Sequence, residues 1–336
     1  MKDIFDNAKL GDLDLKSRII RTGIWETQTH DGGFLDQEVY DRYDKIAKSG
    51  VGAITSEIFA LDHRDRFYPY STHMNYKGFF KDYKELTDLT HQYNVPILGQ
   101  LAFFWYNHDD KQKIEVNDLT IDDIRALQAD VIMAAKKFEF AGFDGIQLNL
   151  GNNFYFARST NPYFNQRTDE YGGDTFGHMR MVLEIIKVIK KNYNLHVNCR
   201  INPNDVRKGG ITEEESIQMC KLLEDYGADS IQITSRTISS FSKDESNKHP
   251  FFIYSENLSD EVKLPIILGG TLRDMSLMNE ILNSTNVEFF SMAKPFTAQK
   301  DFLIDWKKNG KGVSRCQNCN NCYTKKVSTC FKFEDD

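Results

Sequence analysis

The feature that most constrains the fold is a regular alternation of short apolar runs with amphipathic segments of helical periodicity. Several helical segments, such as 36–50 and 121–142, begin with acidic residues and end near Gly or Asn. These are the usual start and stop signals of helices. Runs that read as buried parallel strands are nearly continuous in apolar residues. The strand candidates are 18–24, 52–58, 95–101, 144–150, 196–202, 229–235, 265–270 and 288–293. Eight strand–helix units predict an α/β fold, the (β/α)8 or TIM barrel, with its site at the C-terminal ends of the strands.

The length fits one such barrel and a short extension. The chain has 336 residues, and a (β/α)8 barrel typically needs about 250. No Pro-, Gly- or Ser-rich linker interrupts the alternation, so residues 1–310 are predicted to form one barrel domain. The segment before Arg18 is predicted to be a small hairpin that closes the bottom of the barrel. Residues 311–336 lie outside the repeat and form a Cys-rich tail.

Charge and hydropathy limit the partners. The net charge of −7 disfavours nucleic acid and anionic membranes. No stretch approaches the roughly 18 apolar residues of a membrane span, and the N-terminus has no apolar run typical of a secretory signal. We therefore expect a cytoplasmic protein that binds a small molecule, with no nucleic acid and no membrane.

Several polar residues stand at the predicted strand ends. Gln100 ends the third strand and offers both a donor and an acceptor, which suits the edge of a heterocycle. Arg200 ends the fifth strand, where a cation is costly without a counter-charge or ligand. Gly269 and Gly270 end the seventh strand and Lys294 follows the eighth, which is the usual phosphate site of these barrels. Taken singly, a core amide explains Gln100 equally well, and an inter-strand salt bridge is the alternative for Arg200.

Three motifs resemble the old yellow enzyme family of FMN-dependent oxidoreductases. They are KSRIIRTGIWE (16–26), AGFDGIQLNL (141–150) and RTDEYGG (167–173), and the resemblance extends over roughly residues 4 to 306. It implies FMN as cofactor and NADH or NADPH as reductant. The positions that it places at the flavin are Thr22, Gly23, Ile24, Ile58, Gln100, Arg200, Gly269, Gly270, Ala293 and Lys294.

The residues that would perform the chemistry depart from the family pattern. Where the family has His-x-x-His or His-x-x-Asn followed by a Tyr, this chain has Asn149, Asn152 and Phe154. The two amides can still donate to a carbonyl or nitro oxygen, but Phe154 cannot deliver a proton. Tyr155 or Tyr106 could take over as proton donor, or water could. We assign Asn149, Asn152 and Tyr155 as the catalytic candidates.

The predicted substrate pocket is unusually aromatic. The family has Gln-Leu-x-His after the third strand, whereas here Gln100 is followed by LAFFWY (101–106). An aromatic and more open pocket suits a flat or bulky hydrophobic electrophile; the alternative is that these rings pack beneath a shortened loop. The candidate pocket residues are Trp25, Phe103, Tyr106 and Phe154.

The last candidate site is the tail, where four cysteines follow a C-x2-C-x2-C-x7-C pattern. Four thiolates can hold an iron–sulfur cluster or tetrahedral zinc. The resemblance implies a [4Fe–4S] cluster, because larger relatives carry one after the barrel, although their later intervals are longer. A tail that binds nothing tightly is the third interpretation. The candidate ligands are Cys316, Cys319, Cys322 and Cys330.

The expected function is therefore an NAD(P)H:flavin oxidoreductase that reduces an activated C=C bond by a ping-pong cycle. The first alternative is a flavin-dependent isomerase, or an amine or ether oxidation, on the same fold. The second is a catalytically weak flavin-binding protein for electron transfer, whose tail docks a partner. Relatives are often multimeric, so a homo-oligomer is one expectation.

Overall fold

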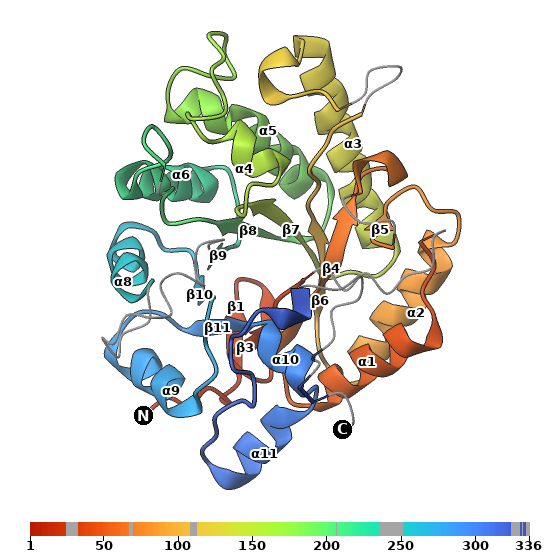
Figure 1. Cartoon of the computed structure of the whole chain (residues 1–336), viewed down its shortest axis with the longest axis vertical. Helices are drawn as coiled ribbons and strands as arrows, with labels where there is room; N and C mark the ends of the chain where they lie inside the picture. Colours follow the sequence, from red (N-terminus) through yellow and green to blue (C-terminus); the bar gives the residue numbers. More distant parts are fainter. Residues whose placement is uncertain are drawn as a thin grey trace.

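The strands of the computed structural model form a closed parallel barrel surrounded by helices (Figure 1). The structure describes residues 1–24, 33–66, 70–107, 113–205, 207–234, 251–323, 330, 332 and 333. Parallel pairing runs in chain order around the ring, and β3 closes it by pairing with both β11 and β4. The barrel strands are β3 (Ile19–Arg21), β4 (Ala53–Ala60), β6 (Ile97–Leu101), β7 (Gly145–Leu150), β8 (His196–Ile201), β9 (Ser230–Ile233), β10 (Ile266–Leu268) and β11 (Phe289–Met292). The predicted fold class is confirmed, and each barrel strand lies within or close to its predicted run.

The helices lie outside this ring and bury one face against it (Figure 1). Several begin at a side-chain cap, as Thr120 and Thr212 do through reciprocal capping boxes. The helices are α1 (Gln37–Lys48), α2 (Phe79–His91), α3 (Ile121–Phe140), α4 (Tyr155–Ser159), α5 (Thr175–Asn192), α6 (Glu213–Asp225), α8 (Phe252–Glu261), α9 (Met275–Ser284), α10 (Lys294–Ala298) and α11 (Phe302–Asn309). Short 3-10 turns are η1 (His63–Asp65), η2 (Val116–Asp118) and η3 (Asn321–Tyr323), and the two-residue strand β5 (Thr72–His73) pairs with the end of β4. No helix in the described ranges is long and apolar enough to cross a membrane.

A hairpin of β1 (Ala8–Leu10) and β2 (Leu13–Leu15) precedes the barrel, as predicted. Leu10 and Leu15 join a buried cluster with residues near the starts of the barrel strands, among them Ile20 and Ala53. The turn at Gly11 lies against His196 at the start of β8. The hairpin therefore covers the N-terminal end of the barrel, opposite the end where a site is expected.

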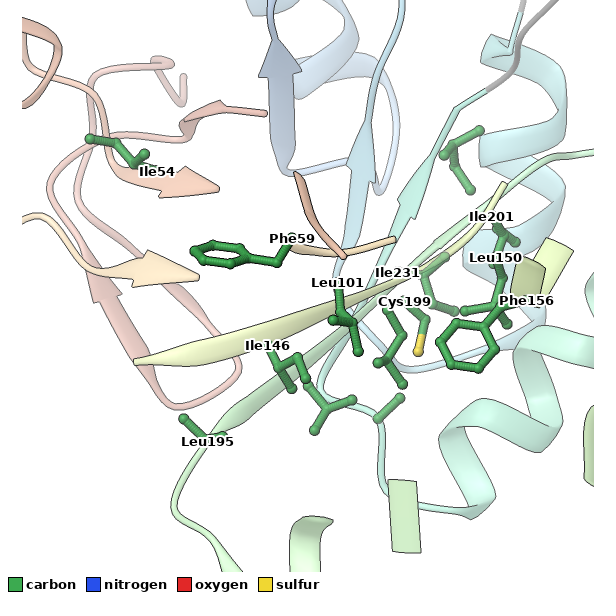
Figure 2. Close-up of a cluster of buried hydrophobic side chains, with 14 of the residues drawn as sticks. Ile54, Phe59, Leu101, Ile146, Leu150, Phe156, Leu195, Cys199, Ile201 and Ile231 are labelled. Carbon is green, nitrogen blue, oxygen red and sulfur yellow. The ribbon is translucent and has the colours of Figure 1, made fainter. Parts of the chain in front are cut away.

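The two faces of the strands differ more than the sequence interpretation allowed. In β7, Ile146, Leu148 and Leu150 belong to the main hydrophobic cluster, whereas Gln147 and Asn149 alternate with them. β8 and β9 repeat this pattern with outward Val197, Cys199, Ile201, Ile231 and Ile233. Figure 2 shows part of the outward cluster, including Ile146, Leu150, Cys199, Ile201 and Ile231.

The inward side chains of these strands form a hydrogen-bonded polar layer. The amide of Gln147 donates to Asn198 Oδ1 (2.6 Å) and to Gln232 Oε1 (2.7 Å). Gln232 Nε2 in turn donates to Thr22 Oγ1 (2.8 Å). The expectation of near-continuous apolar strands was wrong here, because polar groups satisfy one another inside the closed barrel.

Candidate active site

The C-terminal ends of β6, β7 and β8 and the segment after β3 bring together four of the residues predicted from the sequence. Gln100 Oε1 accepts hydrogen bonds from Asn149 Nδ2 (2.9 Å) and from Arg200 Nη1 (3.3 Å). Arg200 also donates through Nη1 to the Gly23 carbonyl (3.4 Å) and through Nη2 to Thr234 Oγ1 (3.0 Å). We call Gly23, Gln100, Asn149, Arg200 and Thr234 the strand-end cluster.

The strand-end cluster contains an unused donor. Gln100 is fully buried, and its Nε2 atom has no hydrogen-bond partner within the described ranges. A buried amide donor without a partner costs about 1–3 kcal/mol. A Cβ added at Gly23 would lie 2.1 Å from that same Nε2 atom and 2.1 Å from the Ser56 carbonyl. The backbone can approach the amide only because residue 23 is a glycine.

This arrangement fits the flavin that the sequence predicts. The pyrimidine edge of a flavin presents carbonyl oxygens and a ring N–H, which an amide and a guanidinium can recognise. Arg200 supplies a fixed positive charge at the same place, which favours negative charge on a reduced ring. Gln100 Nε2, Arg200 and the Gly23 backbone are thus the groups that would hold FMN.

The other predicted flavin contacts lie around this cluster. Thr22 is buried, and its hydroxyl is held by Gln232 rather than directed at the strand ends. Ile24 and Ile58 are buried at the ends of β3 and β4, and Trp25 lies outside the described residues. A Cβ added at Gly269 would meet the Ile233 carbonyl at 2.5 Å, and Gly270 has a φ of +92° that favours glycine.

Lys294 contacts the tail. Its Nζ atom donates to Asn320 Oδ1 (3.0 Å). Burial lowers the pKa of Lys294, while the thiols of Cys316, Cys322 and Cys319 oppose that shift. Lys294 is the first residue of α10, directly after Ala293, and its role at a phosphate stays a prediction.

Tyr155 and Tyr106 are not placed as proton donors. The Tyr155 hydroxyl is buried and donates to the Ile114 carbonyl (2.8 Å), and its ring stacks on Phe103 with 5.4 Å between centroids. The Tyr106 hydroxyl donates to Asp130 Oδ2 (3.3 Å) on α3. Burial raises the pKa of both phenols. The assignment of Tyr155 as acid therefore needs correction, since α4 turns its side chain toward the core.

The two asparagines occupy different environments. Asn149 is fully buried, and its Oδ1 accepts from Gly151 N (3.0 Å). Asn152 is half-buried with a φ of +58°, and its backbone N–H donates to Asn202 Oδ1 (3.4 Å). Asn149 thus supports Gln100, and the substrate-donor role of Asn152 stays a prediction.

The aromatic residues divide between packing and a small cavity. Phe103 contacts Tyr155 and Phe156 in the core, as the packing alternative expected. Phe104 and Phe154 pack together with 4.8 Å between ring centroids. Their rings, with Ile58 and Ala102, line a cavity of about 10 Å³ beside the ends of β4 and β6. Phe103 lines the same cavity, so Phe103, Phe104 and Phe154 are all candidates for a pocket wall.

The sequence analysis missed three residues around this mouth. Asn202 and Thr234 follow β8 and β9, and Asp65 lies in η1 after β4. A polar residue at or next to the end of a predicted strand was the signal available for the first two. His178 on α5 is buried, and its Nε2 atom lies 3.2 Å from the Asn165 carbonyl.

The four tail cysteines gather near the end of β11. All four line one small cavity of about 20 Å³ together with Lys294. Burial raises the pKa of Cys316, and it raises that of Cys322 to about 11. In the parts of the chain that the structure describes, no three His, Cys, Asp or Glu residues are arranged to hold a metal ion. The tail also contacts the barrel, since Arg273 Nη1 donates to the Cys316 carbonyl (3.1 Å).

Comparison with known proteins decides the family. Residues 102–311 match the sequence model of the NADH:flavin oxidoreductase / NADH oxidase family. The chain belongs to this family. Membership confirms the resemblance to the old yellow enzyme family.

The relatives are distant in sequence and close in fold. An NADH oxidase of Thermoanaerobacter brockii is 22% identical and covers 95% of this chain and 53% of its own length. A cinnamate reductase of Clostridium sporogenes is 24% identical, with 89% and 52% covered. The structure of a 2-naphthoyl-CoA reductase with 2-naphthoyl-CoA aligns with a TM-score of 0.86 at 19% identity, covering 95% of this chain and 54% of that chain. The chain thus spans about half the length of these relatives.

Proposed function

We propose that the chain is an FMN-dependent oxidoreductase that takes hydride from NADH or NADPH and reduces an activated C=C bond by a ping-pong cycle. The observation that carries the proposal is the strand-end cluster, in which the buried Gln100 amide, the Arg200 guanidinium and the Gly23 backbone meet. When bound there, FMN would carry hydride from the nicotinamide to the substrate.

The residues of the chain have separate parts in this proposal. Gln100 Nε2 would donate to the flavin edge, and Asn149 holds the Gln100 oxygen so that the amide keeps this orientation. Arg200 would favour the reduced, anionic ring electrostatically. Asn152 would donate to the carbonyl or nitro oxygen that activates the alkene.

The proposed substrate is a small hydrophobic or aromatic electrophile. Phe104 and Phe154 present rings at the cavity beside β4 and β6, and aromatic walls favour flat ligands. Two relatives agree with this class. One is a cinnamate reductase, and the structure of the other contains 2-naphthoyl-CoA. A cytoplasmic location and a homo-oligomer remain part of the proposal.

The test begins with the visible spectrum of protein purified without air, followed by titration with NADH and then NADPH. We expect a flavin spectrum that bleaches with one nucleotide and recovers when cinnamaldehyde or β-nitrostyrene is added. Net consumption of the nucleotide with these acceptors would exclude the isomerase alternative, and efficient turnover would exclude the weak electron-transfer alternative. Absence of flavin after reconstitution with FMN would contradict the proposal.

The cysteine tail is proposed to bind a metal centre, either a [4Fe–4S] cluster or zinc. The four thiols that line one cavity support this proposal, because four cysteine sulfurs can ligate such a centre. Iron, sulfide and zinc are to be measured in anaerobic protein and in Cys319→Ser. Metal in the unmodified protein that is lost in Cys319→Ser is expected; equal, negligible metal in both would remove the metal centre from the proposal.

A further inference from the structure

The loop after β4 places a buried carboxyl group between two cavities. Asp65 is 1% exposed and lies in η1, directly after β4. It lines the cavity at Phe154 and Phe104, which we call the inner cavity. It also lines a pocket of about 290 Å³ against α3, which we call the outer pocket. Of the described residues that line either one, Asp65 alone belongs to both.

The inner cavity can hold a polar guest although two thirds of its described lining residues are apolar. Ser71 lines it, is 3% exposed, and its Oγ atom has no hydrogen-bond partner within the residues that the structure covers. A volume of about 10 Å³ is close to the space that one water molecule requires. A water there would lie between walls that include Ser71 and Asp65.

The outer pocket connects Asp65 with the surface. It is lined by Asp62, Arg64 and Lys137, whose side chains are polar, and by Asn107. Asn107 Nδ2 donates to Asp65 Oδ1 and Lys113 N donates to Asn107 Oδ1 (2.8 Å), so the carboxyl group is held in place from the loop after β6. The carboxyl group can therefore exchange protons outward while its position stays fixed.

We propose that Asp65 supplies the proton of the reduction, passing it from the outer pocket through the inner cavity to the substrate beside Phe154. The inference rests on the proposed function and fills the place left by Phe154, where the family has a Tyr. For each C=C bond reduced, one hydride comes from the nicotinamide reductant and one proton from the Asp65 O–H bond. The Asp65 carboxylate then takes a proton from water in the outer pocket.

The protonation state of Asp65 suits this part. Burial raises the pKa of Asp65 to about 7; the hydrogen bond from Asn107 opposes the shift and the charge of Asp62 adds to it. A donor is most effective when its pKa lies near the working pH. The charged and titratable groups that face Asp65 are Asp62, Arg64 and Arg66 on its own segment, and Tyr106, Asp130 and Lys137 across the outer pocket.

The first measurement is the infrared difference spectrum of the flavin-free protein between pH 5 and pH 9. We expect the carbonyl stretch of one protonated carboxyl group to disappear with a midpoint about neutral pH, and to be absent in Asp65→Asn. In Asp62→Asn the midpoint should move to lower pH, because a neighbouring negative charge is removed. Absence of such a band in the unmodified protein would overturn the proposal.

The second measurement separates the two half-reactions by anaerobic stopped flow with NADH or NADPH and then cinnamaldehyde. Asp65→Asn should be reduced at the normal rate but reoxidised about 10²-fold or more slowly, because general acid catalysis contributes typically about 10²–10⁴-fold. In the unmodified protein, reoxidation should slow about tenfold per pH unit above pH 7, and this dependence should vanish in Asp65→Asn. Ser71→Ala should keep the infrared band and slow reoxidation only.

The outcomes distinguish the two proposals. Normal reoxidation with an unchanged pH profile in Asp65→Asn would overturn the proton path and leave the oxidoreductase intact. An unmodified protein that no nucleotide reduces, or that neither cinnamaldehyde nor β-nitrostyrene reoxidises, would overturn the proposed function and with it the delivery step. The infrared titration of Asp65 does not depend on turnover, so it would still report on the buried carboxyl group.

Discussion

The two sides of the barrel mouth bury polar groups in opposite ways. On the side of β6, β7 and β8, the strand-end cluster is a connected network in which Arg200, Gln100 and Asn149 hydrogen-bond one another. On the side of β4, Asp65 and Ser71 line the inner cavity together with Phe154 and Phe104. A connected network fixes geometry and suits the binding of a cofactor, whereas a buried acid with a raised pKa suits proton transfer.

The largest expected effect comes from a substitution at Gly23 in the strand-end cluster. In Gly23→Ala the new Cβ would lie 2.1 Å from both Gln100 Nε2 and the Ser56 carbonyl, and backbone cannot move aside cheaply. Overpacking of a core typically costs about 1–3 kcal/mol, and we expect the upper end of this range together with loss of FMN. Urea unfolding and flavin content are the measurements. Unchanged stability with a full complement of FMN would show that the cluster is looser than the distances imply.

The strand-end cluster shows what the sequence could predict. Gln100, Asn149 and Arg200 each stand at or near the end of a run that reads as a strand, and parallel strands of a closed barrel end at one rim. Their meeting was therefore predictable, even though their hydrogen bonds to one another were not. The alternation of Gln147 with its apolar neighbours was visible in the sequence as well, but the expectation of strands buried in apolar layers obscured it.

The other side of the mouth was not predictable in this way. Asp65 lies in a charged stretch, DHRDR (62–66), that reads as a solvated loop. Its burial depends on Asn107, 42 positions away, which reaches it from the loop after β6. The assignment of Tyr155 as proton donor was wrong for a similar reason. Contacts with Phe103 and Ile114 set the direction of its side chain, and its neighbours in the chain do not.

The second-largest effect is expected when the positive charge of Arg200 is removed from the strand-end cluster. Hydrogen bonds to charged groups contribute about 1.5–3 kcal/mol, so Arg200→Ala should weaken FMN binding by about 10- to 100-fold. The affinity for reduced flavin should fall more than the affinity for oxidised flavin, because the guanidinium would stabilise the negative charge of the reduced ring. The reduction potential of the bound flavin should therefore fall. Arg180→Ala on the outer face of α5 is the matched control. Equal affinity and potential in Arg200→Ala would exclude the assigned role.

The third effect tests the other side through stability. Because the folded pKa of Asp65, about 7, lies above the ordinary 3.8, its contribution to stability is full below about pH 4 and is lost as pH rises to 7. Between pH 5.5 and pH 8 the loss should be about 2 kcal/mol, at about 1.4 kcal/mol for each pKa unit. Urea unfolding of the flavin-free protein should show this loss relative to Asp65→Asn. Parallel pH profiles of the two proteins would contradict the raised pKa.

The smallest effect is expected when Phe154→Tyr is combined with Asp65→Asn. Phe154→Tyr adds one oxygen to a ring that lines the inner cavity, where Ser71 Oγ lacks a partner among the described residues and Asp65 is near. A buried hydrogen bond contributes about 0.5–1.5 kcal/mol net, so reoxidation of Asp65→Asn should recover about 2- to 10-fold when Phe154→Tyr is added. Phe104→Tyr, which adds the same atom to the neighbouring ring, is the control. If both hydroxyls rescue equally, the proton reaches the substrate from the inner cavity at large and not along a path beside the Phe154 ring.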